Sequence, residues 1–451
     1  MYNLVYIHTH DTGRSISPYG YSCQSDNLLA LAREATLFTH AYSCAPTCSP
    51  SRAAMLTGQL PHQTGMLGLA HRGFFLTQPR HHLANYLASQ GYHTVISGVQ
   101  HEHGRYTDLD PEGLNRLGYQ EILTVSAQDK PCYVAWDRQN ALRAACWIRE
   151  NDDEKPFFLA YGMNATHRPY PEASGIDPDY VRPAFPGENN ADARQDEAAF
   201  QTSVCYADEN VGLIIQALKE KGIYDNTVIL FTTDHGVANP FQKCHLNDFG
   251  IGVSLILRHP VYGQGLISDQ LVSHLDVYPT LCEMLNLPAP GWLEGVSLVS
   301  LLKDGKPVRD RIYAEINFHT SYEPARCVRT ERYKYIRYFD ENWLKTNPSN
   351  TDESAQKSFL LKHGLADRRK PAEALYDCYY DPTETHNVIN ESEYLIIADQ
   401  LRNDLKKNME ATDDPLLRGH LEIKPCHKVN KKGCLLPGSR DPEDYEPQGR
   451  C

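Results

Sequence analysis

The chain has 451 residues, of which 41% are hydrophobic and 22% charged, and 57 acidic against 44 basic residues give a formal net charge of −13. This length allows roughly two or three domains with large cores, which excludes a miniprotein, and the composition excludes a disordered regulator. The acidic balance argues against a nucleic-acid partner, because general nucleic-acid binders gain affinity by neutralising phosphates.

The chain also lacks the marks of a membrane or secreted protein. No apolar run approaches the roughly 18–20 residues of a membrane helix, and the first residues lead into a strand-like segment without a signal peptide's basic and apolar regions. We therefore expect no membrane partner and a cytoplasmic location. The 13 cysteines are odd in number and lack CxxC pairs, which predicts mostly reduced thiols.

Short apolar and β-branched runs alternate with helical patterns over most of the first two thirds of the chain. This alternation is typical of an α/β fold with a large, mostly parallel sheet flanked by helices. The expected strands are 4–7, 94–97, 157–161, 227–232 and 253–257, and the expected helices are 27–33, 141–149 and 191–221.

Beyond residue 306 the pattern changes to Tyr-rich, strand-like pieces at 312–316 and 333–338, followed by a helix around 393–409. This change predicts a smaller C-terminal α+β domain with an antiparallel sheet. The predicted division is an α/β domain at 1–305, an α+β domain at 306–423 and an irregular polar tail at 424–451.

Imidazoles and carboxylates follow several of the expected strands. They are His10 and Asp11 after the first, His101 and His103 after the second, His167 after the third, and Asp234 and His235 after the fourth. A single histidine there is more often structural than functional, but ligands of open α/β sheets bind at the carboxyl ends of the strands. Asp11, Asp234 and His235, with His10 nearby, therefore predict a divalent-metal site. Carboxylates suit Ca²⁺ or Mg²⁺, and imidazole moves the preference toward Mn²⁺ or Zn²⁺.

The segment 44–58 reads CAPTCSPSRAAMLTG and predicts a short helix over 49–56, with a proline tolerated in its first turn and Gly58 able to end it. Cys48 would lie at the helix N-terminus, where the dipole favours an anion, and Arg52 would lie on the same face. Taken alone, this pattern also fits a buried cysteine beside a capped helix.

Cys48-Ser49-Pro50-Ser51-Arg52, followed by Leu56-Thr57-Gly58, resembles the signature of the type I sulfatases, in which the cysteine is oxidised to formylglycine. The resemblance extends to His167-Arg168-Pro169-Tyr170, to Asp234-His235-Gly236 with Lys243, and to Leu375-Tyr376-Asp377. It implies an alkaline-phosphatase-like fold with a large α/β domain and a smaller C-terminal sheet domain.

The resemblance also implies a mechanism and its catalytic residues. A hydrated aldehyde at position 48 attacks sulfur, Arg52 stabilises it, and Lys243 binds the sulfuryl oxygens. His167 protonates the leaving oxygen or nitrogen, and His101 acts as the base that expels sulfate.

One divalent metal is implied, held by Asp11, Asp234, His235 and the residue formed from Cys48, with His10 as a ligand or a close neighbour. Family grounds favour Ca²⁺, with Mn²⁺ or Mg²⁺ as alternatives. A formylglycine maturation enzyme is the implied protein partner.

Two features depart from the family pattern. His10 stands where the family usually has the first of two consecutive aspartates. The Gly-Lys-x-His motif reads Gly98-Val99-Gln100-His101, which removes a lysine that would contact the sulfate. The replacement donors that the sequence offers are Gln100, His103, Arg105, His71 and Arg72.

The signature and the following His62-Gln63 segment resemble most the heparan N-sulfatase branch, and Ser321-Tyr322 with Arg326 resembles its C-terminal domain. Arg326 is thus a candidate substrate-binding residue, and the implied substrate is a sulfate ester or sulfamate on a sugar or glycosaminoglycan fragment. We expect loops 105–126 and 170–190 and the tail to set specificity. Two alternatives stay open: a phosphonate monoester or phosphodiester hydrolase of the same superfamily, and a non-catalytic anion-binding relative.

Overall fold

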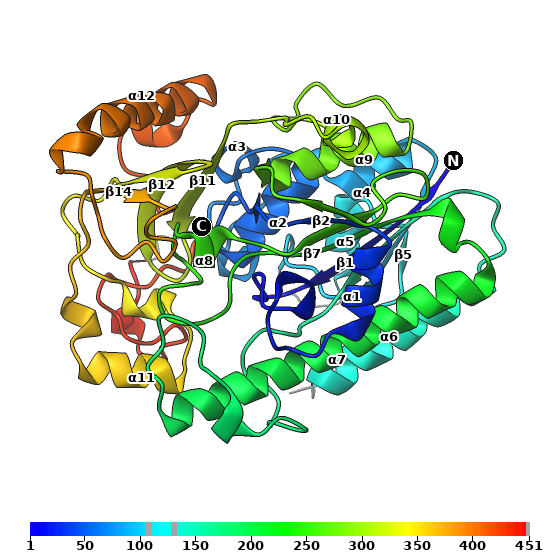
Figure 1. Cartoon of the computed structure of the whole chain (residues 1–451), viewed down its shortest axis with the longest axis horizontal. Helices are drawn as coiled ribbons and strands as arrows, with labels where there is room; N and C mark the ends of the chain where they lie inside the picture. Colours follow the sequence, from blue (N-terminus) through cyan, green and yellow to red (C-terminus); the bar gives the residue numbers. More distant parts are fainter. Residues whose placement is uncertain (105–109, 128–132, 448–451) are drawn as a thin grey trace.

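The computed structural model describes residues 1–104, 110–127 and 133–447. Its largest element is an eight-stranded sheet (Figure 1). The strand order is β5 (Glu121–Ile122), β4 (His93–Gly98), β6 (Phe157–Gly162), β1 (Asn3–Thr9), β7 (Thr227–Thr233), β8 (Leu255–Arg258), β2 (Thr36–Phe38) and β9 (Leu266–Ser268). Only β8 runs antiparallel to its neighbours β7 and β2, so the predicted, mostly parallel sheet is confirmed.

Helices cover both faces of this sheet, which explains why its strands read as continuous apolar runs. In β1, Leu4 and Tyr6 point into one core, and Val5 and Ile7 point into the other. The second core is closed by α1 (Asp26–Arg33), α6 (Tyr133–Glu150) and α7 (Ala191–Lys221), and the first by α2 (Cys48–Thr57), α4 (Leu83–Ser89) and α9 (Val277–Met284).

The other α-helices of this part are α3 (Pro61–Thr64), α5 (Pro111–Leu117), α8 (Asp248–Ile251) and α10 (Val299–Asp304), and a two-stranded sheet pairs β3 (Ala41–Tyr42) with β10 (Val272–Ser273). Helix α7 has the predicted bounds, whereas α6 begins well before residue 141. Its first turns bury polar groups that apolar periodicity does not detect: Asp137 accepts hydrogen bonds from the backbone of Asn164 and Ala165.

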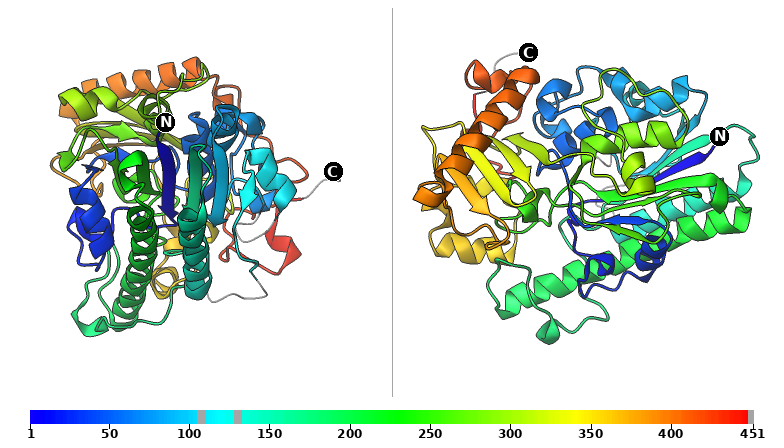
Figure 2. Two further views of the ribbon diagram at one scale, coloured as in Figure 1. Left: turned by 90° about the vertical axis from the view of Figure 1, so that its right-hand side faces the viewer. Right: turned by 45° about the horizontal axis from the view of Figure 1, so that its top comes forward.

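The C-terminal part is the predicted α+β unit (Figure 2). Its antiparallel sheet has the order β11 (Arg311–Phe318), β12 (Tyr322–Thr330), β13 (Tyr333–Tyr338) and β14 (Glu373–Asp377), with α11 (Ala355–Lys362) and α12 (Leu395–Ala411) beside it. The sequence did not predict β12, because Pro324 and buried charges such as Arg326 and Arg329 break its apolar alternation. The domain boundaries stay predictions, although the change of pattern falls between α10 and β11.

The predicted tail has little regular structure, yet it packs against both parts of the protein. The backbone N–H of Lys428 donates to the carbonyl oxygen of Arg72, and the backbone N–H of Asn430 donates to the carbonyl oxygen of Thr320. Val429, between them, is buried. All cysteines within the described residues are free. None of the helices in residues 1–104, 110–127 and 133–447 is long and apolar enough to cross a membrane.

A buried charge network joins α8 to the C-terminal sheet. The ammonium of Lys334, which is completely buried, pairs with Asp248 and lies 2.8 Å from a carboxylate oxygen of Glu384. Arg329 and the hydroxyl of Tyr42 also bind Asp248. The network therefore fixes the C-terminal sheet against the domain that carries the strand ends.

We expect Lys334→Met to lower the free energy of unfolding by about 3–5 kcal/mol, because it leaves the buried carboxylate of Glu384 without its cation. Urea unfolding followed by fluorescence measures the loss. The matched control is Lys345→Met, which removes an exposed ion pair with Asp367 and should cost about 0–1 kcal/mol. Equal losses in the two variants would contradict the role of Lys334.

Candidate active site

Two carboxylates meet where β1 and β7 end. The strands pair in parallel with Thr9 opposite Thr233, so the residues that follow them leave the sheet at the same edge. The backbone N–H of Asp11 donates to Oδ1 of Asp234 at 2.9 Å, and both aspartates are buried. Asp11 takes a left-handed conformation (φ 51°), which turns the chain sharply at this point.

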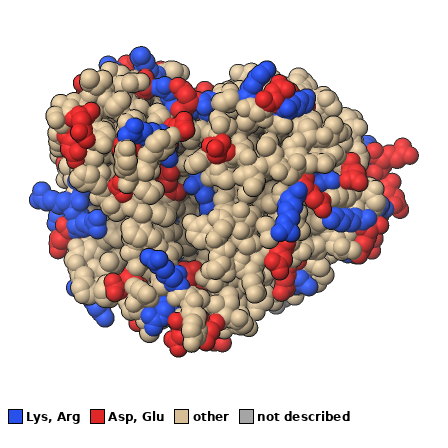
Figure 3. Space-filling model, viewed as in Figure 1, with Lys and Arg blue, Asp and Glu red and all other residues tan. Residues whose placement is uncertain are grey.

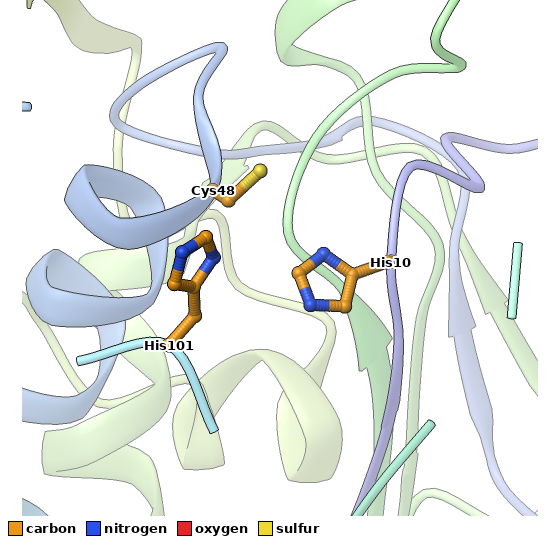
Figure 4. Close-up of side chains that lie close together, drawn as sticks. All are labelled: His10, Cys48 and His101. Atoms are coloured by element: carbon orange, nitrogen blue, oxygen red, sulfur yellow. The ribbon is translucent and has the colours of Figure 1, made fainter. Parts of the chain in front are cut away.

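Cys48 is the first residue of α2 and is almost completely buried. Figure 4 shows its side chain, His10 and His101 pointing toward one another from three separate segments, and their potential ligand atoms all lie within 4.8 Å of one another. Burial, reinforced by Asp11 and Asp234, raises the pKa of the Cys48 thiol well above its usual value. The unmodified thiol is therefore protonated at neutral pH and a poor nucleophile.

Arg52 lies one turn further along α2 and holds the strand ends together. Its guanidinium donates to the backbone oxygen of Thr9 at 2.9 Å and to Oδ2 of Asp234 at 3.1 Å. It also contacts Nδ1 of His8, whose pKa is lowered well below its usual value by burial and by Arg52 itself. His8, which the sequence analysis did not select, thus remains neutral and can accept this hydrogen bond.

His235 is oriented as a metal ligand would be. Its Nδ1 lies 2.9 Å from the carbonyl oxygen of Gly236 and can donate to it, which leaves Nε2 as the ring nitrogen that faces the site. Nε2 lies 3.2 Å from Oδ1 of Asp11 and 3.3 Å from Sγ of Cys48. Burial alone would raise the pKa of Asp234, but His235, Arg52 and His10 hold it well below its usual value, so it is a carboxylate.

These groups fit a divalent cation. His10, Asp11, Cys48 and Asp234 place one potential ligand atom each within 4.8 Å of the others, and all four are buried. Nδ1 of His10 lies 3.0 Å from Oδ2 of Asp234. Burial and Arg52 lower the pKa of His10 to about 4, which leaves its imidazole neutral, the form that coordinates a metal.

Lys243 lies between two acids from different domains. Its Nζ is 2.9 Å from Oδ2 of Asp11 and 2.9 Å from Oδ2 of Asp352. Although burial opposes it, these two carboxylates raise the pKa of Lys243 well above its usual value, so the group is an ammonium. Asp352 lies just before α11 in a polar loop, and no motif in the sequence distinguishes it.

His167 faces the solvent-accessible side of the site, with a side chain that is 20% exposed. Its Nε2 lies 3.8 Å from Oδ2 of Asp11, and its Nδ1 lies 2.5 Å from the carbonyl oxygen of Arg168. It lines a cleft of about 740 Å³. Other residues of the cleft wall come from the starts of α7 and α11, two helices that contact each other (Figure 1). A group leaving the Cys48 side of the site has room to enter this cleft.

The loop after β4 supplies His101. Burial, together with His71 and His10, lowers the pKa of His101 well below its usual value, so the imidazole is neutral and able to accept a proton. The ring of exposed His71 stacks on it, with Nδ1 of His71 3.0 Å from Nε2 of His101. Gln100 braces the same loop, since its side chain accepts hydrogen bonds from the backbone of Glu102 and His103. His103 pairs with Asp110.

Two of the arginines predicted to bind substrate have donors that already bind other groups of the chain. Arg326 is buried against Asp414 and beside Glu315. Arg72 donates to the backbone oxygens of Lys428 and Pro437 and to the side chain of Asn430, so its donors hold the tail. The sequence could not separate these uses, because an arginine that binds carbonyls or carboxylates of its own chain has the same local pattern. Arg105 lies outside the described residues.

Comparisons with known proteins show the family of the chain. The family model described as Sulfatase matches residues 2–287, and the model described as N-sulphoglucosamine sulphohydrolase, C-terminal, matches residues 235–353. Human N-sulphoglucosamine sulphohydrolase is 26% identical over 478 residues, covering 92% of this chain and 91% of that protein.

An ulvan-active sulfatase of Formosa agariphila is 26% identical over 477 residues, covering 91% of this chain and 75% of that protein. A solved structure of a protein in complex with its substrate, D-glucosamine-2-N,6-O-disulfate, matches the fold with a TM-score of 0.69. It is 17% identical, with 92% of this chain and 98% of that chain covered.

The position of Arg72 makes a prediction that separates the two roles considered for it. We expect Arg72→Met to release the tail, so that limited proteolysis cleaves within 424–447 at least about tenfold faster, while KM for a sulfate ester changes less than about threefold. Arg80→Met, at an exposed position, is the matched control. A large rise in KM with unchanged proteolysis would restore Arg72 as a substrate ligand.

Proposed function

The chain belongs to the sulfatase family and is a sulfuric ester hydrolase, and from this premise we propose that it uses a formylglycine formed from Cys48 to desulfate a sulfated sugar. One observation carries the proposal: a buried Cys48 at the start of α2 lies 3.3 Å from His235 and one turn from Arg52. A protonated thiol has little use as a nucleophile at this place, whereas a hydrated aldehyde there offers a hydroxyl to an incoming sulfate.

The sugar substrate is supported by the relatives. Human N-sulphoglucosamine sulphohydrolase and the ulvan-active sulfatase both align with most of the chain. Both O-sulfate and N-sulfate remain within the proposal, because the same residues would bind either sulfate. The proposed substrate is accordingly a sulfate ester or sulfamate on a sugar or glycosaminoglycan fragment.

We further propose one divalent cation, Ca²⁺ on family grounds with Mn²⁺ or Mg²⁺ as alternatives, held by Asp11, Asp234 and His235 and by the residue formed from Cys48. His10 would complete the set or support it. Such a cation polarises a bound oxygen and lowers the pKa of a hydroxyl that it binds. Two buried carboxylates beside neutral imidazoles are a suitable donor set for it.

The chain's own cations hold the sulfate. The Lys243 ammonium would bind the oxygens that become more negative during transfer. Arg52 fixes residue 48 relative to Asp234 through its guanidinium, which is 3.1 Å from that carboxylate. Both side chains are buried, so solvent screens them little.

Two histidines move protons. His167 lies at the cleft, where the leaving group departs, and would donate a proton to its oxygen or nitrogen. His101 is buried and would accept the proton that accompanies release of sulfate. A positioned acid or base of this kind contributes roughly 10²–10⁴-fold.

The proposal is tested on Cys48. After co-expression with a formylglycine maturation enzyme, peptide mass spectrometry should find residue 48 about 18 Da lighter than cysteine, because the –CH2SH side chain has become an aldehyde, –CHO. Cys48→Ala should lower kcat on 4-nitrophenyl sulfate at least about 10³-fold with an unchanged melting temperature. The matched control is Cys282→Ala, a buried cysteine of α9 that should retain activity.

Active protein that contains only thiol at position 48 would refute the proposed mechanism. Faster turnover of an aryl phosphonate monoester than of the aryl sulfate would instead favour the phosphonate hydrolase alternative. Mature protein that binds sulfate and turns over neither compound would indicate a non-catalytic relative.

The two histidines predict different leaving-group dependences. His167→Ala should lose about 10²–10⁴-fold in kcat on a sugar sulfate and clearly less on an activated aryl sulfate, because a good leaving group needs no proton. His101→Ala should lose similar factors on both, since release of sulfate does not involve the departed group. Equal leaving-group dependence in the two variants would show that the roles are wrongly assigned.

A further inference from the structure

Asp352 is a carboxylate at a place that should bind an anion. It lies 2.9 Å from the Lys243 ammonium, which is itself 2.9 Å from Asp11. The Lys243 ammonium already pairs with Asp11, so a second carboxylate is not needed to balance its charge. A negative charge beside Lys243 weakens the attraction for sulfate and calls for another explanation.

The position of Asp352 is firmly held. The side-chain oxygen of Asn350 accepts hydrogen bonds from the backbone of Thr320 and Ser321 at 3.0 and 2.8 Å. The backbone N–H of Ser349 donates to the carbonyl oxygen of Cys434, and the ammonium of Lys357 donates to the backbone oxygen of Thr351 at 2.8 Å. The backbone on both sides of Asp352 is thus fixed, as it must be for a side chain that recognises a ligand.

Asp352 belongs to the wall of the cleft that also contains His167, the space available to the leaving group. Its side chain is 16% exposed, so one part faces Lys243 and another can be reached from the cleft. The acidic side chains that line this cleft are Glu172, Asp192, Asp196, Asp352 and Glu353. Of these acids, Asp196 is paired with Arg168 and Glu353 is paired with Lys357, and His167 lines the same cleft.

The face shown in Figure 3 carries scattered acidic and basic side chains without a broad basic stretch. A long polyanionic chain would find little favourable field there, and the acids of the cleft would repel further anionic groups.

We infer that Asp352 selects the non-sulfate part of the substrate: it accepts a hydrogen bond from a hydroxyl or ammonium group near the scissile bond and disfavours a second anion there. The substrate class is then a singly sulfated molecule whose remainder is neutral or cationic, such as a short sugar or amino sugar without carboxylates. This inference rests on the proposed function, because it assumes that sulfate binds at Lys243 and the leaving group at His167.

The test uses three aryl sulfates that differ in charge and little in leaving-group reactivity. They are phenyl sulfate, 3-carboxyphenyl sulfate and 3-(aminomethyl)phenyl sulfate, assayed with the matured full-length protein. Wild type should show kcat/KM about tenfold lower for the carboxylate and about tenfold higher for the ammonium than for phenyl sulfate, as one partly screened charge pair gives. Added salt should reduce both differences.

Asp352→Asn should reduce the ammonium-to-carboxylate ratio of kcat/KM about tenfold or more, and using a ratio cancels any change in sulfate binding at Lys243. Glu172→Gln, in the same wall, should reduce it by a smaller factor. Asp367→Asn removes the same charge from a side chain that is 84% exposed outside the cleft, and should leave the ratio unchanged.

The outcomes separate the two proposals. A wild-type protein that hydrolyses all three sulfates equally, or an Asp352→Asn variant with the wild-type ratio, overturns the role of Asp352 and leaves the sulfatase proposal standing. Matured wild type that releases sulfate from none of the three overturns the proposed function itself. If Asp352→Asn fails to fold, Asp352→Ser is assayed in its place, with the same expected loss of the ratio and the same outcome that overturns the role.

Discussion

The active-site end of the structure depends on how two carboxylates are buried next to each other. Parallel pairing of β1 with β7 fixes Asp11 and Asp234 at one edge of the sheet, where they cannot separate. Burying like charges costs several kcal/mol per ion unless cations meet them. Arg52 and Lys243 meet them from two different segments, and a divalent cation would complete the balance.

The same balance fixes the reactive residue. Arg52 must reach Asp234 and the carbonyl oxygen of Thr9, and this sets the position of α2, all of whose residues are buried. Cys48 is the first residue of that helix, so the contact of Arg52 that neutralises Asp234 also places the Cys48 β-carbon near the two carboxylates. The cysteine position and the charge balance are therefore one structural requirement, and a shift of α2 would disturb both.

This dependence explains which features the sequence could predict. The strands β1, β4, β6 and β7 were predictable because both faces are buried and each reads as an apolar run; the residues that follow them then converge by topology. The roles of Arg72 and Arg326 were not predictable, since each binds groups brought close by tertiary packing. Asp352 was not predictable for a related reason: it reaches Lys243 from a polar loop of another domain, whose placement depends on buried ion pairs such as Lys334 with Asp248.

The C-terminal part is thus more than a cover for the sheet. Lys243 is the point at which its acid, Asp352, meets an acid of the large domain, Asp11, at equal distances of 2.9 Å. An ammonium shared in this way attracts sulfate less strongly than one paired with a single acid. This arrangement lowers the affinity of the site for anions in general but makes it selective between substrates, because a substrate with a second negative charge is disfavoured most. The charge that Asp352 adds would then act on the choice of leaving group rather than on the chemistry at residue 48.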